Sequence, residues 1–399
     1  MRTQSLAKIA VVGMVGVLAL TACSNSKKSG SGLGGGASSS GATSGGTYTI
    51  AFEGPLSGDN QQLGINEVNA AELAVKQANA KGDLGFTLKL LKADDVGDPS
   101  KAPAAAAQVL QDNTVMGVIG PSFSGATKAV GNTYGDAGLA VITPSASNGT
   151  LQTLGFKTFH RIIPNDNVEG TQGADWLARK GLKKVFVVDD QSDYGKGVAD
   201  AVQNELKAKG VTVTRSSVDA KTTDYGAAAQ SVKSSGAGAL FYGGYDAQAA
   251  LFAKALKAVN YAGITAGGNG VKSSVFTKGA GDAGNGWYFT CGCLDATIAA
   301  NAKQFTADYT KAYNTPPSTY SPEAFDATNA LIQAIKDAKA KGPVTKASVL
   351  AAVNAVDYQG ITTEVKFGAD GEPAGATTVS LYTQKAGQIV SVGLLKDQS

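Results

Sequence analysis

The strongest constraint on the fold is a regular alternation of short apolar runs with longer stretches of helical periodicity. The first runs lie at residues 48–52, 88–91, 115–119 and 139–142. Residues 65–78 place apolar side chains at spacings of three and four, and an Asp-Pro pair at residues 98–99 predicts a helix that continues to Leu110. Strands that alternate with such helices are typical of α/β proteins with mainly parallel sheets.

The same rhythm restarts in the second half of the chain. Strand-like runs lie at residues 184–188, 211–214, 239–242, 263–265 and 286–290, and later at 364–367 and 377–383. Helical stretches lie at residues 299–313, 322–339 and 346–356. The restart predicts two doubly wound, Rossmann-like lobes joined by three hinge crossings, near Pro164, Cys291 and Thr377. We expect the first lobe to contain residues 47–165 and 292–376, and the second to contain residues 166–291 and 377–399.

The N-terminus has the pattern of a lipoprotein signal. Arg2 and Lys8 precede an apolar run at residues 9–20, too short for the roughly 20 residues that span a bilayer. The sequence Leu20-Thr21-Ala22-Cys23 resembles a lipobox, which predicts a signal peptide over residues 1–22 and a lipid on Cys23. Residues 23–46, rich in Ser and Gly, predict a flexible tether. We therefore expect an extracytoplasmic protein held by lipid on the outer face of the cell membrane.

Charge and histidine content argue against several classes of function. The precursor has 35 basic and 32 acidic residues, a balance that gives no support for nucleic-acid binding. His160 is the only histidine, and we interpret it as structural. The acidic pairs Asp94-Asp95 and Asp189-Asp190 follow strands, where neighbouring side chains point to opposite sides. No nucleophile with a base and no metal-ligand cluster is evident, so we expect no enzyme activity, no cofactor and no metal.

Two cysteines remain after the predicted lipidation site. Cys291 and Cys293 are separated by one glycine. Without nearby histidines this pair is too sparse for a metal site. The sequence leaves open whether they form a disulfide or stay as two partly buried thiols.

Several short motifs, taken in order, resemble the leucine/isoleucine/valine-binding proteins, which have the type I periplasmic-binding fold. They lie at residues 51–58, 94–99, 118–121, 142–147, 193–195, 242–245 and 324–327. The resemblance covers nearly the whole chain after the tether. It implies that two lobes close over a branched-chain or related amino acid and that an ABC permease recognises the closed form. We expect a monomer that works with such a permease.

Two loops of small polar residues follow predicted strands and are candidates for holding the ligand. They lie at residues 120–125 and 143–148. Loops at the carboxyl ends of parallel strands lead into helix N-termini, whose N–H groups favour anions. The resemblance implies that Ser124 binds the ligand carboxylate, that Ser145 offers its backbone carbonyl to the ammonium group, and that Ser147 contacts both groups. Ordinary helix capping is the alternative for all three serines.

Tyrosines of the second half are the other candidates. The resemblance places Tyr194 and Tyr245 where aromatic side chains cover the ligand, and Tyr320 at a third aromatic position. Packing in a core or on the surface is the alternative for each of them. Both Tyr194 and Tyr245 follow strands within glycine-flanked turns, which favours the pocket.

The sequence departs from the family pattern at two positions. Asn269 stands where the resemblance implies an ammonium-binding glutamate, and Leu63 stands where an aromatic side chain is often found. An amide accepts a hydrogen bond from ammonium but supplies no charge. Asp246 or Glu323 could supply it instead, or each could be a solvated or capping carboxylate. The alternative ligands are therefore an amide, an aromatic acid or another small carboxylate, and a ligand sensor is the alternative to a transport component.

Overall fold

The computed structural model describes residues 45–375 and 377–398. These residues all belong to one compact unit. The predicted signal peptide, Cys23 and the tether up to residue 44 lie outside the described residues. Within the described part, no helix is long and apolar enough to cross a membrane.

The first lobe is built on a five-stranded parallel sheet with the order β2-β1-β3-β4-β5. Its strands are β1 (Thr47–Gly54), β2 (Thr87–Asp94), β3 (Val115–Ile119), β4 (Ala140–Thr143) and β5 (Phe159–Arg161). The central strands β3 and β4 are buried along their whole length. They are continuous apolar runs because helices cover both faces of the sheet.

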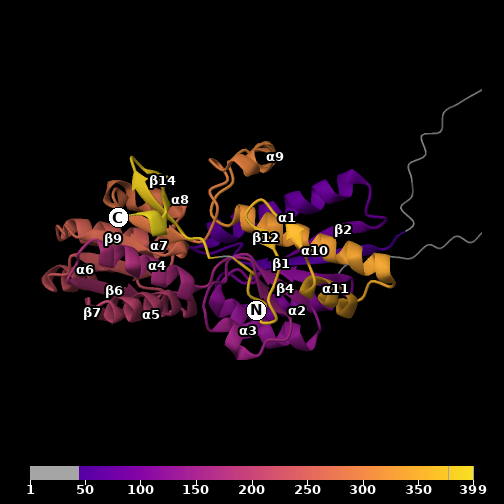
Figure 1. Ribbon diagram of the computed structural model, residues 1–399, viewed down its shortest axis with the longest axis horizontal. Coiled ribbons are helices and arrows are strands. Elements are labelled where there is room, and N and C mark those ends of the chain that lie inside the picture. Colours follow the sequence, from indigo (N-terminus) through magenta and orange to yellow (C-terminus); the bar gives the residue numbers. More distant parts are fainter. Residues whose placement is uncertain (1–44, 376, 399) are drawn as a thin grey trace, which may run out of the picture. The chain divides into compact units, whose positions relative to one another are not determined.

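Helices cover the two faces of the first sheet in a doubly wound arrangement. One face carries Ile50 and Phe52 against α1 (Gln61–Lys81), α10 (Ser321–Lys341) and α11 (Lys346–Asn354). The other face carries Ala51 against α2 (Ala102–Gln111) and α3 (Ser124–Asp136). Helix α9 (Lys303–Tyr313) packs beside α1. In Figure 1 the orange α10 lies beside the indigo α1, although the two are far apart in sequence.

The second lobe repeats the same strand order and adds a hairpin. Its sheet runs β14-β13-β10-β9-β8-β6-β7, in which β13 and β14 are antiparallel and the others parallel. The strands are β6 (Lys184–Asp189), β7 (Thr212–Ser217), β8 (Ala239–Gly243), β9 (Ile264–Gly267), β10 (Tyr288–Cys291), β13 (Ser380–Lys385) and β14 (Gln388–Leu394). Helices α4 (Asp166–Arg179) and α5 (Asp193–Ala208) cover one face, and α6 (Gly226–Ser234), α7 (Asp246–Ala258) and α8 (Ser274–Ala280) cover the other.

Three chain crossings join the lobes. The first runs from β5 to α4, the second from β10 toward α9, and the third from β12 (Glu364–Val365), which pairs with β11 (Tyr358–Gln359), to β13. The structure is thus an α/β fold of two doubly wound lobes, as the sequence predicts.

The structure corrects some local expectations and settles the state of the cysteines. Helix α2 begins at Ala102 rather than at residues 98–99, because the Asp98 carboxylate accepts a hydrogen bond from the Ser100 N–H (2.9 Å) and closes a separate turn. Strand β14 was not predicted; it is a half-exposed edge strand without a strong apolar pattern. Cys291 and Cys293 form a disulfide, with Cα atoms 5.1 Å apart.

Candidate ligand-binding site

The candidate site lies where both sheets change winding direction. In the first lobe, β1 and β3 are neighbours whose following helices, α1 and α3, pack on opposite faces. In the second lobe, β6 and β8 stand in the same relation, with α5 and α7 on opposite faces. The carboxyl ends of strands at such points are where open α/β sheets bind ligands.

Residues of both lobes enclose a cavity of about 10 Å³ at this place. Its lining consists of Ser122, Phe123, Ser124, Ser145, Tyr194, Tyr245, Asn269 and Tyr320. Six of the seven residues predicted from the sequence are in this set. The seventh, Ser147, lies behind Asn269, whose Nδ2 is 3.5 Å from the Ser147 Oγ. The structure therefore brings the predicted residues together from distant segments of the chain.

The serines come from the two small-polar loops of the first lobe. Ser124 is the first residue of α3, and its Oγ accepts a hydrogen bond from the Asn148 N–H (3.1 Å). No side chain caps α3, so the N–H groups of its first turn are available to an anion. Ser145 Oγ donates to the Ser122 carbonyl (2.7 Å), which ties the two loops together. Ser122 and Phe123 were not predicted, although they lie on the same loop as Ser124.

Aromatic rings form the walls of the cavity. The Tyr245 ring stacks on Phe123, with centroids 4.3 Å apart, and also lies 5.2 Å from the Tyr194 ring. The Tyr194 hydroxyl accepts a hydrogen bond from the Gly270 N–H (3.0 Å), which fixes its position. Tyr320 adopts a left-handed φ of 69°, a conformation that costs a residue other than glycine about 1 kcal/mol. This backbone turn precedes α10, and the Tyr320 hydroxyl donates to the Asn269 Oδ1 (2.7 Å).

Asn269 is held by a buried carboxylate that the sequence reasoning missed. Glu169 Oε1 accepts the Asn269 backbone N–H (2.9 Å), and Oε2 accepts its Nδ2 (2.6 Å). Thr290 Oγ1 also donates to Glu169 Oε1 (2.7 Å). Glu169 is 1% exposed, and burial raises its pKa to about 7. The amide orientation of Asn269 follows from these contacts, because the opposite orientation would place two oxygens against each other.

Asp166, one turn before Glu169 on α4, is a second missed carboxylate. It is fully buried, and neither of its oxygens has a well-formed hydrogen-bond partner among the described residues. Burial, followed by the nearby Glu169, raises its pKa well above the usual range, whereas the Ser147 hydroxyl and Arg161 act in the opposite direction. In the sequence, acidic residues in the first turn of a helix are normally read as favourable partners of the helix dipole. Because this ordinary explanation accounts for Asp166 and Glu169, the sequence gives no signal that either residue lies at the site.

The other acids named from the sequence lie elsewhere. Asp246 accepts hydrogen bonds from Ser273 Oγ (2.5 Å) and Asn60 Nδ2 (2.6 Å), and Glu323 accepts one from the Leu294 N–H (2.7 Å). Neither lines the cavity. Leu63 is fully buried in the first lobe and does not line it either.

The lobes are in direct contact around the cavity. Lys128 and Asp193 form an ion pair across the lobes (2.7 Å), and Asn148 Nδ2 donates to the Asp193 carbonyl (2.5 Å). The bond from Asn60 to Asp246 connects the lobes at another point. A volume of about 10 Å³ holds roughly one water molecule. A small-molecule ligand can therefore enter only when the lobes separate.

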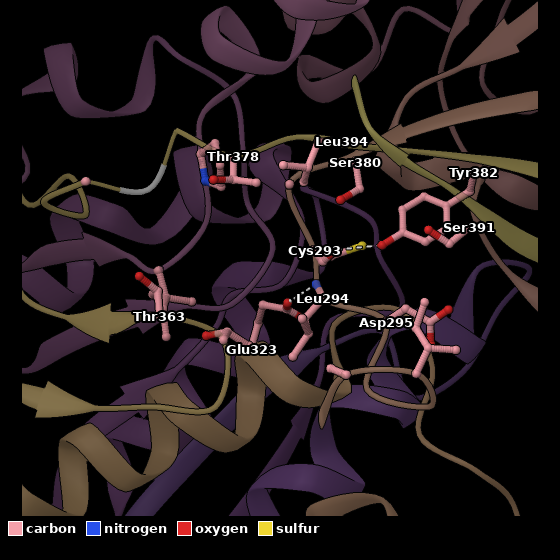
Figure 2. Close-up of a pocket in the computed structure, with 17 residues that line it drawn as sticks. Cys293, Leu294, Asp295, Glu323, Thr363, Thr378, Ser380, Tyr382, Ser391 and Leu394 are labelled. Carbon is pink, nitrogen blue, oxygen red and sulfur yellow. Dashed lines mark hydrogen bonds between the residues drawn. The ribbon is translucent and has the colours of Figure 1, made fainter. Parts of the chain in front are cut away.

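A larger cavity of about 380 Å³ lies at the chain crossings, and Figure 2 shows its lining. Cys293 and Leu294 come from the second crossing, and Thr378 comes from the third. The Tyr382 hydroxyl donates to the Cys293 carbonyl (3.0 Å) at its edge. None of the seven residues predicted to bind the ligand lines it, although Glu323, named above as an alternative source of charge, does. Size alone does not identify a binding site; the smaller cavity has polar groups that converge from both lobes at strand ends.

The fold and this site define the class of two-lobed α/β binding proteins. The sequence matches the periplasmic binding protein family over residues 47–388, and the chain belongs to this family. It is 29% identical over 358 residues to a Leu/Ile/Val-binding protein of Rhizobium johnstonii, covering 86% of this chain and 93% of that one. It is 30% identical over 311 residues to a leucine-, isoleucine-, valine-, threonine- and alanine-binding protein of Pseudomonas aeruginosa, covering 77% and 82%.

Solved structures show the same fold. A branched-chain amino acid transporter substrate-binding protein of Streptococcus pneumoniae, in complex with isoleucine, superposes with a TM-score of 0.78 at 25% identity, covering 87% of this chain and 99% of that one. An ABC transporter solute-binding protein of R. palustris, in complex with benzoate, gives 0.79 at 21% identity, covering 88% and 96%. This chain is thus an extracytoplasmic substrate-binding protein of the branched-chain amino acid ABC transporter family.

Proposed function

We propose that this protein captures a small carboxylate ligand, a branched-chain or related amino acid, between its two lobes and delivers it to an ABC permease. The observation that carries the proposal is the convergence of Ser124, Ser145, Tyr194, Tyr245, Asn269 and Tyr320 on one cavity between the lobes. The residues come from both sheets, so a ligand bound there would hold the lobes together. Binding and lobe closure are then the same event.

The first-lobe loops supply what a carboxylate requires. The Ser124 hydroxyl and the free N–H groups at the start of α3 are donors in a buried site, where hydrogen bonds to a charged group contribute about 1.5–3 kcal/mol each. The carbonyl of Ser145, on the neighbouring loop, is an acceptor for an amine. Ser124 is 1% exposed, so water competes little for these contacts.

An aromatic acid is the second candidate ligand. The stacked rings of Phe123 and Tyr245 offer a flat apolar surface beside the serines. Similar structures have been solved with benzoate and, from Rhodopseudomonas palustris, with 3,4-dihydroxybenzoic acid. Such a ligand would use the carboxylate donors and leave the Asn269 amide without a charged partner. No described contact favours a sensor over a transport component.

The test is a thermal-shift screen of the mature chain with Cys23→Ser, which removes the predicted lipid. Leucine, isoleucine, valine, benzoate and amides are the ligands. A thousandfold excess over Kd stabilises a protein by about 4 kcal/mol, so a true ligand raises the unfolding temperature clearly. Ser124→Ala should abolish the shift, whereas Ser231→Ala, an exposed serine on α6, should leave it unchanged. No shift with any of these carboxylates would contradict the proposal.

The membrane anchor and the lobe boundaries stay proposals of the same kind. We propose that residues 1–22 are removed, that Cys23 carries lipid, and that the mature protein is a monomer. We also propose lobe boundaries at residues 165, 291 and 376. Mass spectrometry of the N-terminal peptide tests the lipid, and a wild-type protein that stays in the aqueous phase after detergent phase separation would contradict it.

A further inference from the structure

The charge at the candidate site is not on Asn269 but one hydrogen bond behind it. Glu169 takes three hydrogen bonds, two from Asn269 and one from Thr290. It forms no ion pair with a lysine or arginine among residues 45–375 and 377–398, and neither does its buried neighbour Asp166. Two buried carboxylates without an ion-pair partner are costly unless a positive group binds near them or they take up a proton.

The same contacts decide which end of the Asn269 amide faces the cavity. Nδ2 points to Glu169, so Oδ1 is left on the side of Tyr320, whose hydroxyl donates to it. A carbonyl oxygen has two lone pairs, so Oδ1 can accept one further donor. If the acceptor at position 169 were absent, the amide could turn and present Nδ2, which repels a cationic donor.

We propose that Glu169 is a positioning residue that makes this site select ligands with a protonated amine beside the carboxylate. It acts through Asn269, by holding the amide with its acceptor toward the ligand and by placing directly behind it a carboxylate whose charged form a bound ammonium group stabilises. Asp166 adds to that charge from the same turn of α4. The inference rests on the proposed function, because it assumes that a carboxylate ligand occupies this cavity.

The test compares two pairs of ligands that differ only in the amine: leucine with 4-methylpentanoate, and phenylalanine with 3-phenylpropanoate. Calorimetric titration of the Cys23→Ser protein gives Kd for each. We expect the amine-bearing member to bind more tightly in at least one pair. Glu169→Gln, which keeps the shape but removes the charge and one of the two acceptor oxygens that hold Asn269, should weaken binding of the amine at least tenfold, about 1.4 kcal/mol. The same variant should bind the amine-free acid of each pair with an unchanged or a lower Kd.

Two further variants separate a charge effect from a merely structural one. Glu169→Gln combined with Asn269→Glu moves the charge to the cavity wall and should restore the preference for the amine. Glu364→Gln removes an exposed carboxylate on β12 and should change neither Kd. Equal weakening of both members of a pair by Glu169→Gln, or no rescue by the double variant, would overturn the inference.

The outcomes distinguish this inference from the proposed function. If the wild-type protein binds the amine-free acids as well as or better than the amino acids, Glu169 does not select for an amine, although the cavity is still a carboxylate site. If none of the four ligands binds, the proposed function fails and the inference fails with it.

Discussion

Arg161 is the residue whose loss should damage both stability and ligand binding. It lies at the end of β5, its side chain is fully buried, and it holds the loop that carries Ser145 and Ser147. Nη1 donates to the carbonyls of Ala146 and Asn148 (both 3.0 Å), and Nη2 donates to Gln152 Oε1 (2.5 Å). Nε pairs with Glu372 at 2.7 Å.

Arg161→Met keeps much of the apolar volume but removes all four contacts. Each buried carbonyl left without a donor costs about 1–2 kcal/mol, and the two partly exposed partners, Gln152 and Glu372, add less. We expect the free energy of unfolding to fall by about 3–5 kcal/mol, a large share of the 5–15 kcal/mol typical of folded domains. Because the loop loses its support, affinity for the ligand should fall as well.

Urea denaturation followed by circular dichroism measures the loss of stability, and calorimetric titration measures the affinity. Arg161→Lys is the matched control. It keeps a cation but lacks the planar fork, so it should fall between the wild type and Arg161→Met. A loss below about 1 kcal/mol for Arg161→Met, with unchanged affinity, would refute the reasoning that this guanidinium supports the loop.

Three other perturbations have defined outcomes. Burial raises the pKa of Glu169 to about 7 from 4.5, so the folded protein holds a proton that the unfolded chain releases; this residue's contribution to stability falls as the pH rises from about 4.5 to 7 and is level above. In urea denaturation at a series of pH values, Glu169→Gln should reduce the dependence of the unfolding free energy on pH between about 4.5 and 7. The titratable groups that interact with Glu169 are still present in this variant; they are Asp166, Tyr194 and Tyr320. Gly268→Ala puts a Cβ 2.5 Å from the Tyr194 hydroxyl, so it should lower the free energy of unfolding by about 1–3 kcal/mol and weaken ligand binding. Thermal shift with and without ligand measures both effects. In the control Gly46→Ala the added Cβ meets nothing within 4 Å, so this variant should be neutral. Lys128→Ala removes an exposed ion pair and should change the free energy of unfolding by less than about 0.5 kcal/mol. Salt at about 0.5 M should erase this difference, because it screens charges at the surface. A larger effect that salt does not reduce would contradict the view that this ion pair is a weak surface contact.

The buried strands were predictable from the sequence because burial on both faces leaves a continuous apolar run. The run from Val115 to Ile119 is an example, and its boundaries are those of β3. Strand β14 carries no such run because one side of it faces solvent at a sheet edge. The start of α2 was misplaced because Asp98 closes a turn with its own side chain, a local competition that an Asp-Pro pair does not reveal.

The site residues that could be predicted are those that follow a strand in the sequence and match a motif of the family. Ser124 and Tyr245 lie in the segments that follow β3 and β8, which places them at the ligand edge of a parallel sheet. Glu169 was missed because it is distant in sequence from Asn269, and an acid in the first turn of a helix has an ordinary explanation. Only the packing of α4 beneath β10, where Thr290 also contacts Glu169, brings the carboxylate behind the amide.

Tyr320 gives the site a consequence for the order in which this chain becomes active. The five parallel strands of the first sheet, β1 to β5, and the five of the second, β6 to β10, all precede it in the sequence, and α10 begins directly after it. A chain that emerges N-terminus first could pair these strands while the last wall of the cavity and the helix that covers the first sheet are still missing. Binding competence would then appear only once the chain has been made beyond Tyr320, within its final fifth, so a nascent or truncated chain that ends before this residue has no way to trap solute.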